Sequence, residues 1–522
     1  MKLAISSMIS KIDVFSAKVL GLSVKTLMEK SGIAVADTVR ARVKQGSSVI
    51  VLAGKGNNGG DGYAAAVSLM DEYKLTVIDV FGLGQKNEAG KYFLGLYKER
   101  GGRLLNYEPT DEIHREIKSA GCVIDAVFGT GFVGEMPESI RPLAITVREA
   151  VETHKIAIDV PLGINPDDGS VSDFVISVEA TVALSYIKPG IISYPARAYV
   201  GDIIYNSLGL PGEEIDENFA FKYHMVDSDF AREAIPKRES NSNKGSFGKL
   251  LLITGSEKYR GAAHLSAEAA LRGGVGLVTF AGCGELTTEL SAKYPEIIYN
   301  KISDVSEITN EEIEALVELS KKHTATLIGS GSDNTEGLLS LTLRLLDTEG
   351  GVLVLDADAI NALSSIGEKG LLALKEAKRK VIITPHPLEF ARLTGDEVAK
   401  VQLHRLEKAE TFARESGVIL VLKGASTIIT DGNRVYINTT GSSALAKAGS
   451  GDVLAGLIGA MCAQRSMPDE IAATVSVYLH GLAGDTLARE FSSYGVTPSD
   501  LPRRIAAEIS EFELHPEGVS QK

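Results

Sequence analysis

The segment SVIVLAGKGNNGGDG, residues 48–62, decides the fold of the first part of the chain. Its apolar run SVIVLA predicts a buried strand, and the glycines after it predict a sharp turn into a helix. Read from Gly54, the turn is G-K-G-N-N-G, which matches the G-x-G-x-x-G pattern of dinucleotide-binding folds. This pattern is weakly specific by itself, because any sharp strand-to-helix turn can use glycines.

Apolar runs alternate with helical patterns through most of the remaining sequence. The first series is SVIVLAG, LTVIDVFG, GCVIDAVFG, KIAIDVP and ATVALS, and it ends near residue 206. Residues 218–249 break the rhythm, and within them the polar stretch KRESNSNKGSFGK, residues 237–249, indicates a joint or mobile loop. The second series is KLLLITG, LVTFAG, ATLIGSG, GVLVLDAD, KVIITP and VILVLKG, followed by STIITDGNRVYINT, which predicts a hairpin turning at residues 431–433. Alternation of this kind predicts an α/β protein with parallel sheets and crossover helices, here in two domains, residues 1–217 and 223–515.

The composition excludes several classes of protein. The 522 residues carry a formal charge of -14, which argues against a nucleic-acid binder. Three cysteines, Cys122, Cys283 and Cys462, lack metal-ligand spacing and are expected to be buried free thiols. Lys11 and Asp13 interrupt any signal-peptide core, and no run of about 18 apolar residues predicts a membrane span. We therefore expect a cytoplasmic protein without membrane contact.

Polar side chains follow the strands of the first half, at the sheet edge where ligands of parallel sheets bind. Asn57, Asn58 and Asp61 follow the first strand, Asp125 ends the third, and Asp159 follows the fourth. Converging amide and carboxylate oxygens suit a hard cation. Two alternatives remain open. Asp79 lies twenty residues after Gly59, where a dehydrogenase keeps its ribose-binding acid, and each aspartate can simply cap a helix or turn.

Two further features of the first half indicate chemistry. The turn FGTGF, residues 128–132, offers backbone N–H groups to a phosphate. Asp159 ends its own strand, and Pro161 stiffens the turn behind it, so Asp159 is the candidate acid/base. Three aspartates at neighbouring strand ends favour a functional site over three unrelated caps.

In the second half, A-G-S-G-D at residues 448–452 opens an apolar helix. Glycines at a helix start present N–H groups to an anion, and Asp452 lies where a base would accept a hydroxyl proton. This arrangement suits phosphoryl transfer to an alcohol, although a plain glycine-rich N-cap is the alternative. Lys423 ends a strand in LKGASTII, and His386 stands between two prolines that fix its backbone. Either residue can also be purely structural.

The motifs of the first half resemble the epimerase domain of the NAD(P)H-hydrate repair enzymes. They are G-N-N-G-G-D-G at 56–62, D-A-V-F-G-T-G at 125–131 and D-V-P-x-G at 159–163. The resemblance implies a Rossmann-like epimerase domain over residues 1–217 and a potassium ion at Asn58, Asp125 and Leu162. The family usually has Ser where this chain has Leu162, so a ligand there is a backbone carbonyl or is lost. The implied residues for the hydrated dinucleotide are Asn57, Asn58, Gly59, Gly60, Asp61, Gly129, Thr130, Gly131, Phe132, Val133, Gly134, Glu135 and the catalytic Asp159.

The second half, residues 223–515, resembles the ribokinase-like fold and within it the ADP-dependent NAD(P)H-hydrate dehydratases. Its motifs are Y-x-G-A at 259–262, T-P-H-P-x-E at 384–389, K-G-x-x-T at 423–427 and A-G-S-G-D-V-L-A-G at 448–456. The family more often has G-P-G where this chain has G-S-G at 329–331. The implied hydrate contacts are Ala262, Gly331, His386 and the catalytic Asp452. The implied nucleotide contacts are Lys423, Gly424, Ala425, Ser426, Thr427, Ser443, Ala444, Leu445, Ala446, Lys447, Ala448, Gly449, Ser450 and Gly451.

Together the two resemblances imply a bifunctional isomerase and lyase. One domain interconverts the two C6 epimers of NADHX and NADPHX, and the other dehydrates the S epimer with ADP as co-substrate and a magnesium ion at its site. A homo-oligomer is expected. The competing hypothesis is a ribokinase-like small-molecule kinase fused to a non-catalytic nucleotide- or cation-binding module.

Overall fold

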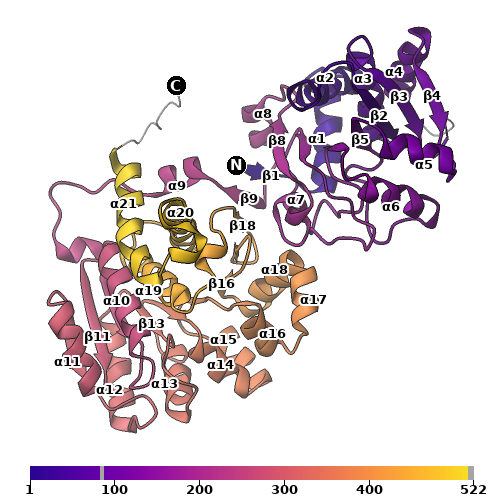
Figure 1. The fold of residues 1–522 in the computed structure, drawn as a ribbon. Helices are drawn as coiled ribbons and strands as arrows, with labels where there is room; N and C mark the ends of the chain where they lie inside the picture. The colour runs from indigo at the N-terminus through magenta and orange to yellow at the C-terminus, as the bar shows by residue number, and fades with distance from the viewer. Residues whose placement is uncertain (83–86, 515–522) are drawn as a thin grey trace. The chain divides into compact units, whose positions relative to one another are not determined.

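The computed structural model describes residues 1–82 and 87–514. They form two compact units, one from Lys2 to Tyr223 and one from His224 onward that also takes in Met1 (Figure 1). Each unit has its own sheet flanked by helices, so the predicted α/β class is confirmed. None of the helices in this part of the chain combines the length and the apolar character needed to cross a membrane. The three cysteines are buried and free, as expected.

The N-terminal unit is a parallel sheet with strand order β4-β3-β2-β5-β6-β7-β8. Its strands are β2 (Ser48–Ala53), β3 (Lys74–Asp79), β4 (Arg103–Asn106), β5 (Cys122–Ala126), β6 (His154–Ile158), β7 (Ala180–Leu184) and β8 (Asp202–Asn206), and the chain starts with β1 (Lys2–Leu3). Its helices are α1 (Ser6–Lys18), α2 (Val24–Arg42), α3 (Asn57–Leu69), α4 (Glu88–Glu99), α5 (Asp111–Lys118), α6 (Arg141–Glu149), α7 (Pro189–Ile192) and α8 (Gly212–Asn218).

The strand β2 is buried on both faces because helices cover both sides of the sheet. Val49 and Val51 pack into an apolar core with α2, α3 and α4, whereas Ile50 and Leu52 pack into a second core with α5 and α6. Successive side chains point to opposite faces of a strand, so one continuous apolar run supplies both cores. The run SVIVLA therefore marks a central strand, and β2 lies at the point where the strand order changes direction, between β3 and β5.

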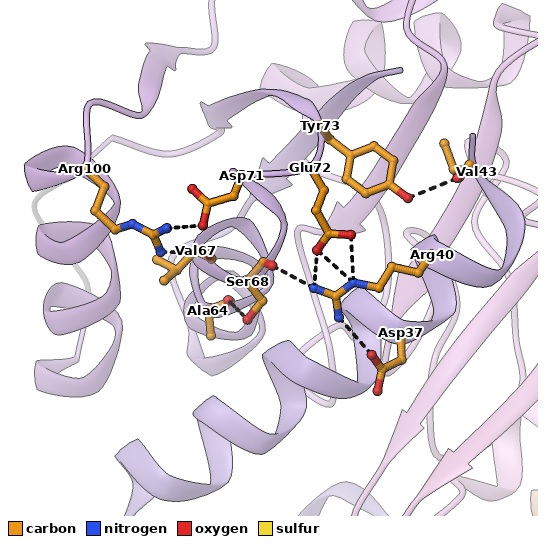
Figure 2. Close-up of polar contacts among 10 residues, drawn as sticks. All are labelled: Asp37, Arg40, Val43, Ala64, Val67, Ser68, Asp71, Glu72, Tyr73 and Arg100. Carbon is orange, nitrogen blue, oxygen red and sulfur yellow. Dashed lines mark hydrogen bonds and ion pairs between the residues drawn. The ribbon is translucent and has the colours of Figure 1, made fainter. Parts of the chain in front are cut away.

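Arg40, near the end of α2, connects this helix to the end of α3 (Figure 2). Its guanidinium donates to the carbonyl oxygen of Ser68 at 2.9 Å and to the Glu72 carboxylate at 2.7 Å, and it also contacts Asp37. These pairs are exposed and add little stability individually. Their consequence is geometric, because they join α2 to the helix that begins at the glycine-rich turn.

The C-terminal unit has the strand order β9-β18-β17-β16-β15-β14-β13-β10-β11-β12. These strands are β9 (Tyr223–Val226), β10 (Lys249–Ile253), β11 (Leu277–Gly282), β12 (Ile298–Lys301), β13 (Ala325–Ile328), β14 (Val352–Leu355), β15 (Val381–Ile383), β16 (Ile419–Leu422), β17 (Ile428–Thr430) and β18 (Val435–Asn438). The helices are α9 (Ser228–Ala234), α10 (Arg260–Arg272), α11 (Gly284–Lys293), α12 (Asn310–Lys321), α13 (Glu336–Leu346), α14 (Asp358–Ser365), α15 (Glu368–Lys375), α16 (Pro387–Thr394), α17 (Val398–Leu403), α18 (Arg405–Ser416), α19 (Ser450–Ala463), α20 (Asp469–Gly495) and α21 (Leu501–Leu514).

Pairing is parallel from β16 to β12, and β17 and β18 form the predicted antiparallel hairpin. Residues 218–249, which break the α/β rhythm, contain β9 and α9. The predicted joint at residues 237–249 contains a short 3-10 helix, Lys244–Phe247, and the first residue of β10. The strand order changes direction between β10 and β13, which is where α/β sheets of this kind bind ligands.

Candidate active sites

Asn58 lies in the first turn of α3, at the point where the N-terminal sheet changes direction. Its Nδ2 donates to the carbonyl oxygen of Phe128 at 2.8 Å. Its Oδ1 is buried and finds no hydrogen-bond partner among the described residues. A buried acceptor without a partner is unfavourable unless a ligand or ion satisfies it. The position therefore fits a cation that prefers oxygen ligands.

Asp125 lies at the end of β5 and is 1% exposed. Its Oδ1 accepts a hydrogen bond from Val127 N at 3.1 Å and its Oδ2 accepts one from Leu162 N at 2.6 Å. Burial raises the pKa of Asp125 to about 7. The side chain of Leu162 packs in the core beside α6, and its carbonyl oxygen accepts from Ile176 N at 3.1 Å. The Leu162 backbone thus contacts Asp125, while its side chain contributes no ligand atom.

Asp159 follows β6 with a φ of 68°, a backbone conformation that is strained for a residue other than glycine. Its Oδ2 and the Oδ1 of Asn58 both border Gly129, because a Cβ added to this glycine would lie 3.2 Å from the first oxygen and 3.3 Å from the second. The structure thus brings together the three predicted site residues Asn58, Gly129 and Asp159. A strained aspartate at a strand end is the geometry expected of a functional group.

The glycine-rich turn itself is tightly packed. A Cβ on Gly59 would lie 2.0 Å from the carbonyl oxygen of Gly54, so only glycine fits there. Of the polar residues in this turn, Asn57 is exposed. Asp61 is less accessible, and burial raises its pKa well above the usual value. Asp79 is not free for a ribose. It is 1% exposed, and its Oδ2 accepts from the Tyr63 hydroxyl at 2.7 Å, which removes the support it gave to a dehydrogenase.

The segment FGTGF continues into an exposed loop. Phe132 is buried and contacts the tilted ring of Phe128, with ring centroids 5.5 Å apart, so this side chain belongs to the core. Residues 133–135 are exposed, and Gly134 has a positive φ of 82°. Thr130 is half-buried and Gly131 is exposed. The buried Phe132 side chain therefore holds the loop against the core, while the residues on either side of it are exposed to solvent.

The second site centres on Asp356, which follows β14 and is 1% exposed. Its Oδ1 accepts hydrogen bonds from Thr384 Oγ1 at 2.6 Å and from Lys423 Nζ at 3.0 Å. Its Oδ2 accepts from Ser330 Oγ at 2.8 Å. Residues that follow the four neighbouring strands β13 to β16 thus meet at the Asp356 carboxylate. One of the donors is Ser330, the serine of the G-S-G turn.

Asp452 lies in the first turn of α19. Its pKa is raised to about 7, chiefly by burial and also by the charge of Asp356, while the charge of Lys423 acts in the opposite direction. The lysine lies close to the start of the same helix, since a Cβ added to Gly451 would be 3.4 Å from Lys423 Nζ. A carboxyl group that titrates near neutrality beside helix N–H groups is suited to act as a general base.

The predicted hydrate contacts Ala262 and Gly331 lie against each other. A Cβ on Gly331, whose φ is 62°, would be 2.5 Å from the Ala262 Cβ. A cavity of about 1070 Å³ is lined by residues near them in the sequence, including Lys258, Arg260 and Asp333. Neither Ala262 nor Gly331 lines this cavity, so it does not indicate a ligand against the two small residues.

His386 has a clear structural role. It is the N-cap of α16, where its Nδ1 accepts from Glu389 N at 3.2 Å and its backbone N–H donates to Glu389 Oε2 at 2.7 Å. Burial lowers the pKa of His386, and the charge of Lys423 lowers it further, so the imidazole is neutral at physiological pH. Its side chain is 46% exposed, which leaves the ring accessible from solvent.

The predicted nucleotide segments form two irregular turns. Gly424 has a φ of 137° and Ser426 one of 51°, and Thr427 Oγ1 donates to the Gly424 carbonyl at 2.9 Å. Residues 443–445 form a short 3-10 helix, and Gly449 has a φ of 100° where α19 begins. The Lys447 ammonium donates to the carbonyl oxygens of Tyr494, at 2.6 Å, and Val496.

Comparison with known proteins matches both units. The family model described as YjeF-related protein N-terminus matches residues 24–190, and the one described as NAD(P)H-hydrate dehydratase matches residues 250–507. The bifunctional NAD(P)H-hydrate repair enzyme Nnr of Moorella thermoacetica is 33% identical over 494 residues, which cover 91% of this chain and 90% of that protein. This chain belongs to the family of bifunctional NAD(P)H-hydrate repair enzymes. The family member of Escherichia coli is 31% identical over 497 residues, 93% of this chain and 90% of that protein.

One solved structure similar to the C-terminal half is the ADP/ATP-dependent NAD(P)H-hydrate dehydratase of Bacillus subtilis, co-crystallized with ATP and Mg²⁺. It is 28% identical, covers 56% of this chain and 99% of its own, and has a TM-score of 0.48. Within the described residues of this repair-enzyme family member, no group of three or more His, Cys, Asp or Glu side chains is placed to hold a metal ion. A cation at these sites would therefore need other ligands besides one or two such side chains, for example amide, carbonyl or phosphate oxygens.

Sequence reasoning missed four residues of these sites in this member of the repair-enzyme family. Asp356 and Lys188 each contact a predicted site residue through an ion pair. Arg405, 2% exposed, donates to the carbonyl oxygens of Leu422 and Lys423, and so supports the K-G-x-x-T turn. His480 Nε2 lies 3.0 Å from the Ser450 carbonyl, beside Asp452, and burial lowers its pKa to about 4. Of the four, only Asp356 stood at a visible strand end, in GVLVLDAD.

Proposed function

We propose that this protein repairs hydrated nicotinamide cofactors. Its N-terminal unit interconverts the R and S epimers of NADHX and NADPHX, and its C-terminal unit dehydrates the S epimer with ADP, giving NAD(P)H, AMP and phosphate. Membership of the bifunctional family over nearly the whole chain supports both activities. The observation that carries the chemistry is the position of the half-buried Asp452 at the glycine-rich start of α19, close to Lys423, where its pKa is raised to about 7.

The epimerase step needs one group that exchanges protons with the oxygen atom bonded to C6 of the reduced ring. The ring nitrogen expels the C6 hydroxyl, which leaves a planar iminium that water re-enters from either face. In our proposal the protonated carboxyl group of Asp159 gives its proton to the departing oxygen, and the carboxylate so formed takes a proton from the incoming water. The position of Asp159 Oδ2, next to Asn58 and Gly129, supports this role.

The dehydratase step converts the C6 hydroxyl into a better leaving group. In our proposal Asp452 takes the hydroxyl proton as the oxygen attacks the terminal phosphorus of ADP, and AMP departs. The phosphate then leaves C6 with the electrons of the C–O bond, while a proton leaves C5 and the ring double bond forms. N–H groups at the start of α19 and the Lys423 ammonium would stabilise the transferring phosphoryl group.

Two metal ions complete the proposal. The buried Oδ1 of Asn58, which lacks a partner among the described residues, supports potassium near Asn58 and Asp125, with the Leu162 backbone as the neighbouring segment; the ion would orient the hydrate's oxygens. Magnesium, with which the Bacillus subtilis dehydratase was co-crystallized, would rely on nucleotide phosphate oxygens and one or two carboxylates. A homo-oligomer and a cytoplasmic location stay predictions.

One product analysis tests the function. Purified protein is incubated with a mixture of R and S hydrates and with ADP or ATP, and NADH absorbance, orthophosphate and the epimer ratio are followed. We expect complete recovery of NADH with stoichiometric phosphate. Accumulation of a phosphorylated alcohol without NADH would instead favour the small-molecule kinase, and recovery of only the S fraction would favour a non-catalytic N-terminal module.

A further inference from the structure

Lys188 is a buried lysine in contact with the carboxylate proposed to act in the epimerase site. It is 1% exposed. Its ammonium donates to Asp159 Oδ1 and, at 2.9 Å, to the carbonyl oxygen of Leu184. A charged group is stable in such surroundings only when it is paired and hydrogen-bonded. The contact with Asp159 is therefore what allows a charged lysine in this place.

The ends of β6 and β7 meet through this pair. β7 ends at Leu184, which donates its N–H to Asp159 Oδ1 at 3.3 Å and offers its carbonyl to Lys188. Ser185 then turns the chain with a φ of 62°, and Pro189 begins α7 directly after the lysine. A proline at the first helical position fixes the local backbone, so the root of the Lys188 side chain is held firmly.

The two oxygens of Asp159 consequently differ. Oδ1 accepts from Lys188 and Leu184. Oδ2 has no hydrogen-bond donor in the part of the chain that the structure describes, and it faces the space over Gly129 next to Asn58. A carboxylate held by one oxygen cannot rotate freely, so the other oxygen keeps a defined direction.

Two further carboxyl groups, those of Asp13 and Asp61, also interact electrostatically with the Lys188 ammonium. Burial is the main cause that raises the pKa values of Asp13 and Asp61; the charge of Asp159 also raises both, and the charge of Lys188 lowers both. Removal of the ammonium would therefore make ionisation of these carboxyl groups less favourable.

We infer that Lys188 is a positioning residue of the epimerase reaction, which holds Asp159 Oδ1 so that Oδ2 meets the reacting C6 oxygen. This inference rests on the proposed epimerase function. The lysine itself touches neither hydrate nor water in the reaction. Its effect is therefore expected on turnover and much less on substrate binding.

The test compares Lys188→Met, which keeps the apolar stem and removes the charge, with Lys188→Arg and the wild-type protein. Epimer interconversion is followed by chiral chromatography, and ADP-dependent dehydration is measured in the same preparations. We expect Lys188→Met to lower the epimerase kcat by about 10²-fold with little change in KM. Lys188→Arg should retain more activity than Lys188→Met but less than wild type, because the planar guanidinium cannot place a nitrogen at the same point.

Chemical rescue distinguishes a role of Lys188 in positioning Asp159 from a role in stabilising the fold. Ethylammonium added to Lys188→Ala should restore epimerase turnover in a saturable way, whereas ethanol, which is similar in size and uncharged, should not. Lys155→Met is the matched control, since this half-buried lysine of β6 donates to the carbonyl oxygen of Ala150 and not to a carboxylate. It should leave both activities unchanged.

Unchanged kcat in Lys188→Met, or a change confined to KM, would overturn the inference. If Lys188→Met does not fold, Lys188→Arg decides: a lower kcat at constant KM supports the inference and wild-type kcat refutes it. Failure of the proposed function is recognised separately. In that case the wild-type protein does not interconvert the epimers at all, or Asp159→Asn interconverts them at the wild-type rate.

Discussion

Lys423 and Asp356 form a partly buried ion pair, in which the lysine Nζ lies 3.0 Å from the aspartate Oδ1. The pair controls the charge around Asp452, because Asp356 raises the pKa of that carboxyl group and Lys423 lowers it. Neutralising Asp356 removes a negative charge and leaves the positive one unpaired. Both changes favour the ionised form of Asp452.

For Asp356→Asn we therefore expect the acid limb of the dehydratase pH profile to move to lower pH. The measurement is kcat/KM for the S hydrate as a function of pH, in the variant and in wild type. Asp347→Asn, which breaks an exposed ion pair with Lys378, is the control and should leave the limb in place. If the acid limb of Asp356→Asn lies at the same pH as that of wild type, Asp356 does not influence the pKa of the catalytic base.

In the wild-type protein, dehydration should lose rate as the pH falls through about 7, the value to which burial raises the pKa of Asp452. A protonated carboxyl group cannot accept the hydroxyl proton, so kcat/KM should fall about tenfold per pH unit below that value. Steady-state rates from about pH 5 to 9 with saturating ADP check this. A profile that is flat across neutrality would contradict a base with this pKa.

Asp452→Asn should abolish ADP-dependent recovery of NADH, by a factor of about 10² to 10⁴, which is usual for a general base. Epimer interconversion should continue, and it serves as the internal control. The same variant should be more stable than wild type at pH 8 and not at pH 3, because a carboxyl group whose pKa is raised on folding costs stability once it is ionised. Thermal unfolding at the two pH values measures this difference.

Asp159→Asn should stop the interconversion of R and S hydrates and leave dehydration of the S epimer intact. Chiral chromatography detects the first activity and NADH absorbance the second. A variant that loses both would indicate a folding defect and not a catalytic one.

Asn58→Leu should weaken the dependence of epimerase activity on potassium, since it removes a buried Oδ1 that lacks a partner among the described residues while keeping the side-chain volume. Activity is titrated with KCl against a background of a large organic cation. The control is Asn218→Leu, at an exposed asparagine at the end of α8 whose side chain donates to the carbonyl oxygen of Glu214. Identical potassium curves for Asn58→Leu and wild type would exclude this asparagine as a ligand.

The fold and part of each site could be predicted from the sequence because the signals are local. An apolar run followed by glycine marks a strand and its turn, and Asp125, Asp159 and Lys423 each stand at such a strand end. Lys188 and Asp356 could not be connected to their partners, because 29 residues separate Lys188 from Asp159 and 67 separate Asp356 from Lys423. Contacts at such separations depend on strand order.

Asp79 illustrates the opposite error. Its spacing from the glycine-rich turn matches that of a ribose-binding acid. In the structure the Tyr63 hydroxyl donates a hydrogen bond to Asp79. Sequence spacing alone could not predict that this tyrosine of α3 packs against the end of β3.

The apolar cores of the two units share no residue, and each is assembled from one side of the Tyr223–His224 boundary. Damage to the packing around β2 would thus spare the machinery at Asp452. A cell carrying such a variant would still convert the S hydrate back to NAD(P)H, and would depend on non-enzymatic epimerisation to repair the R hydrate.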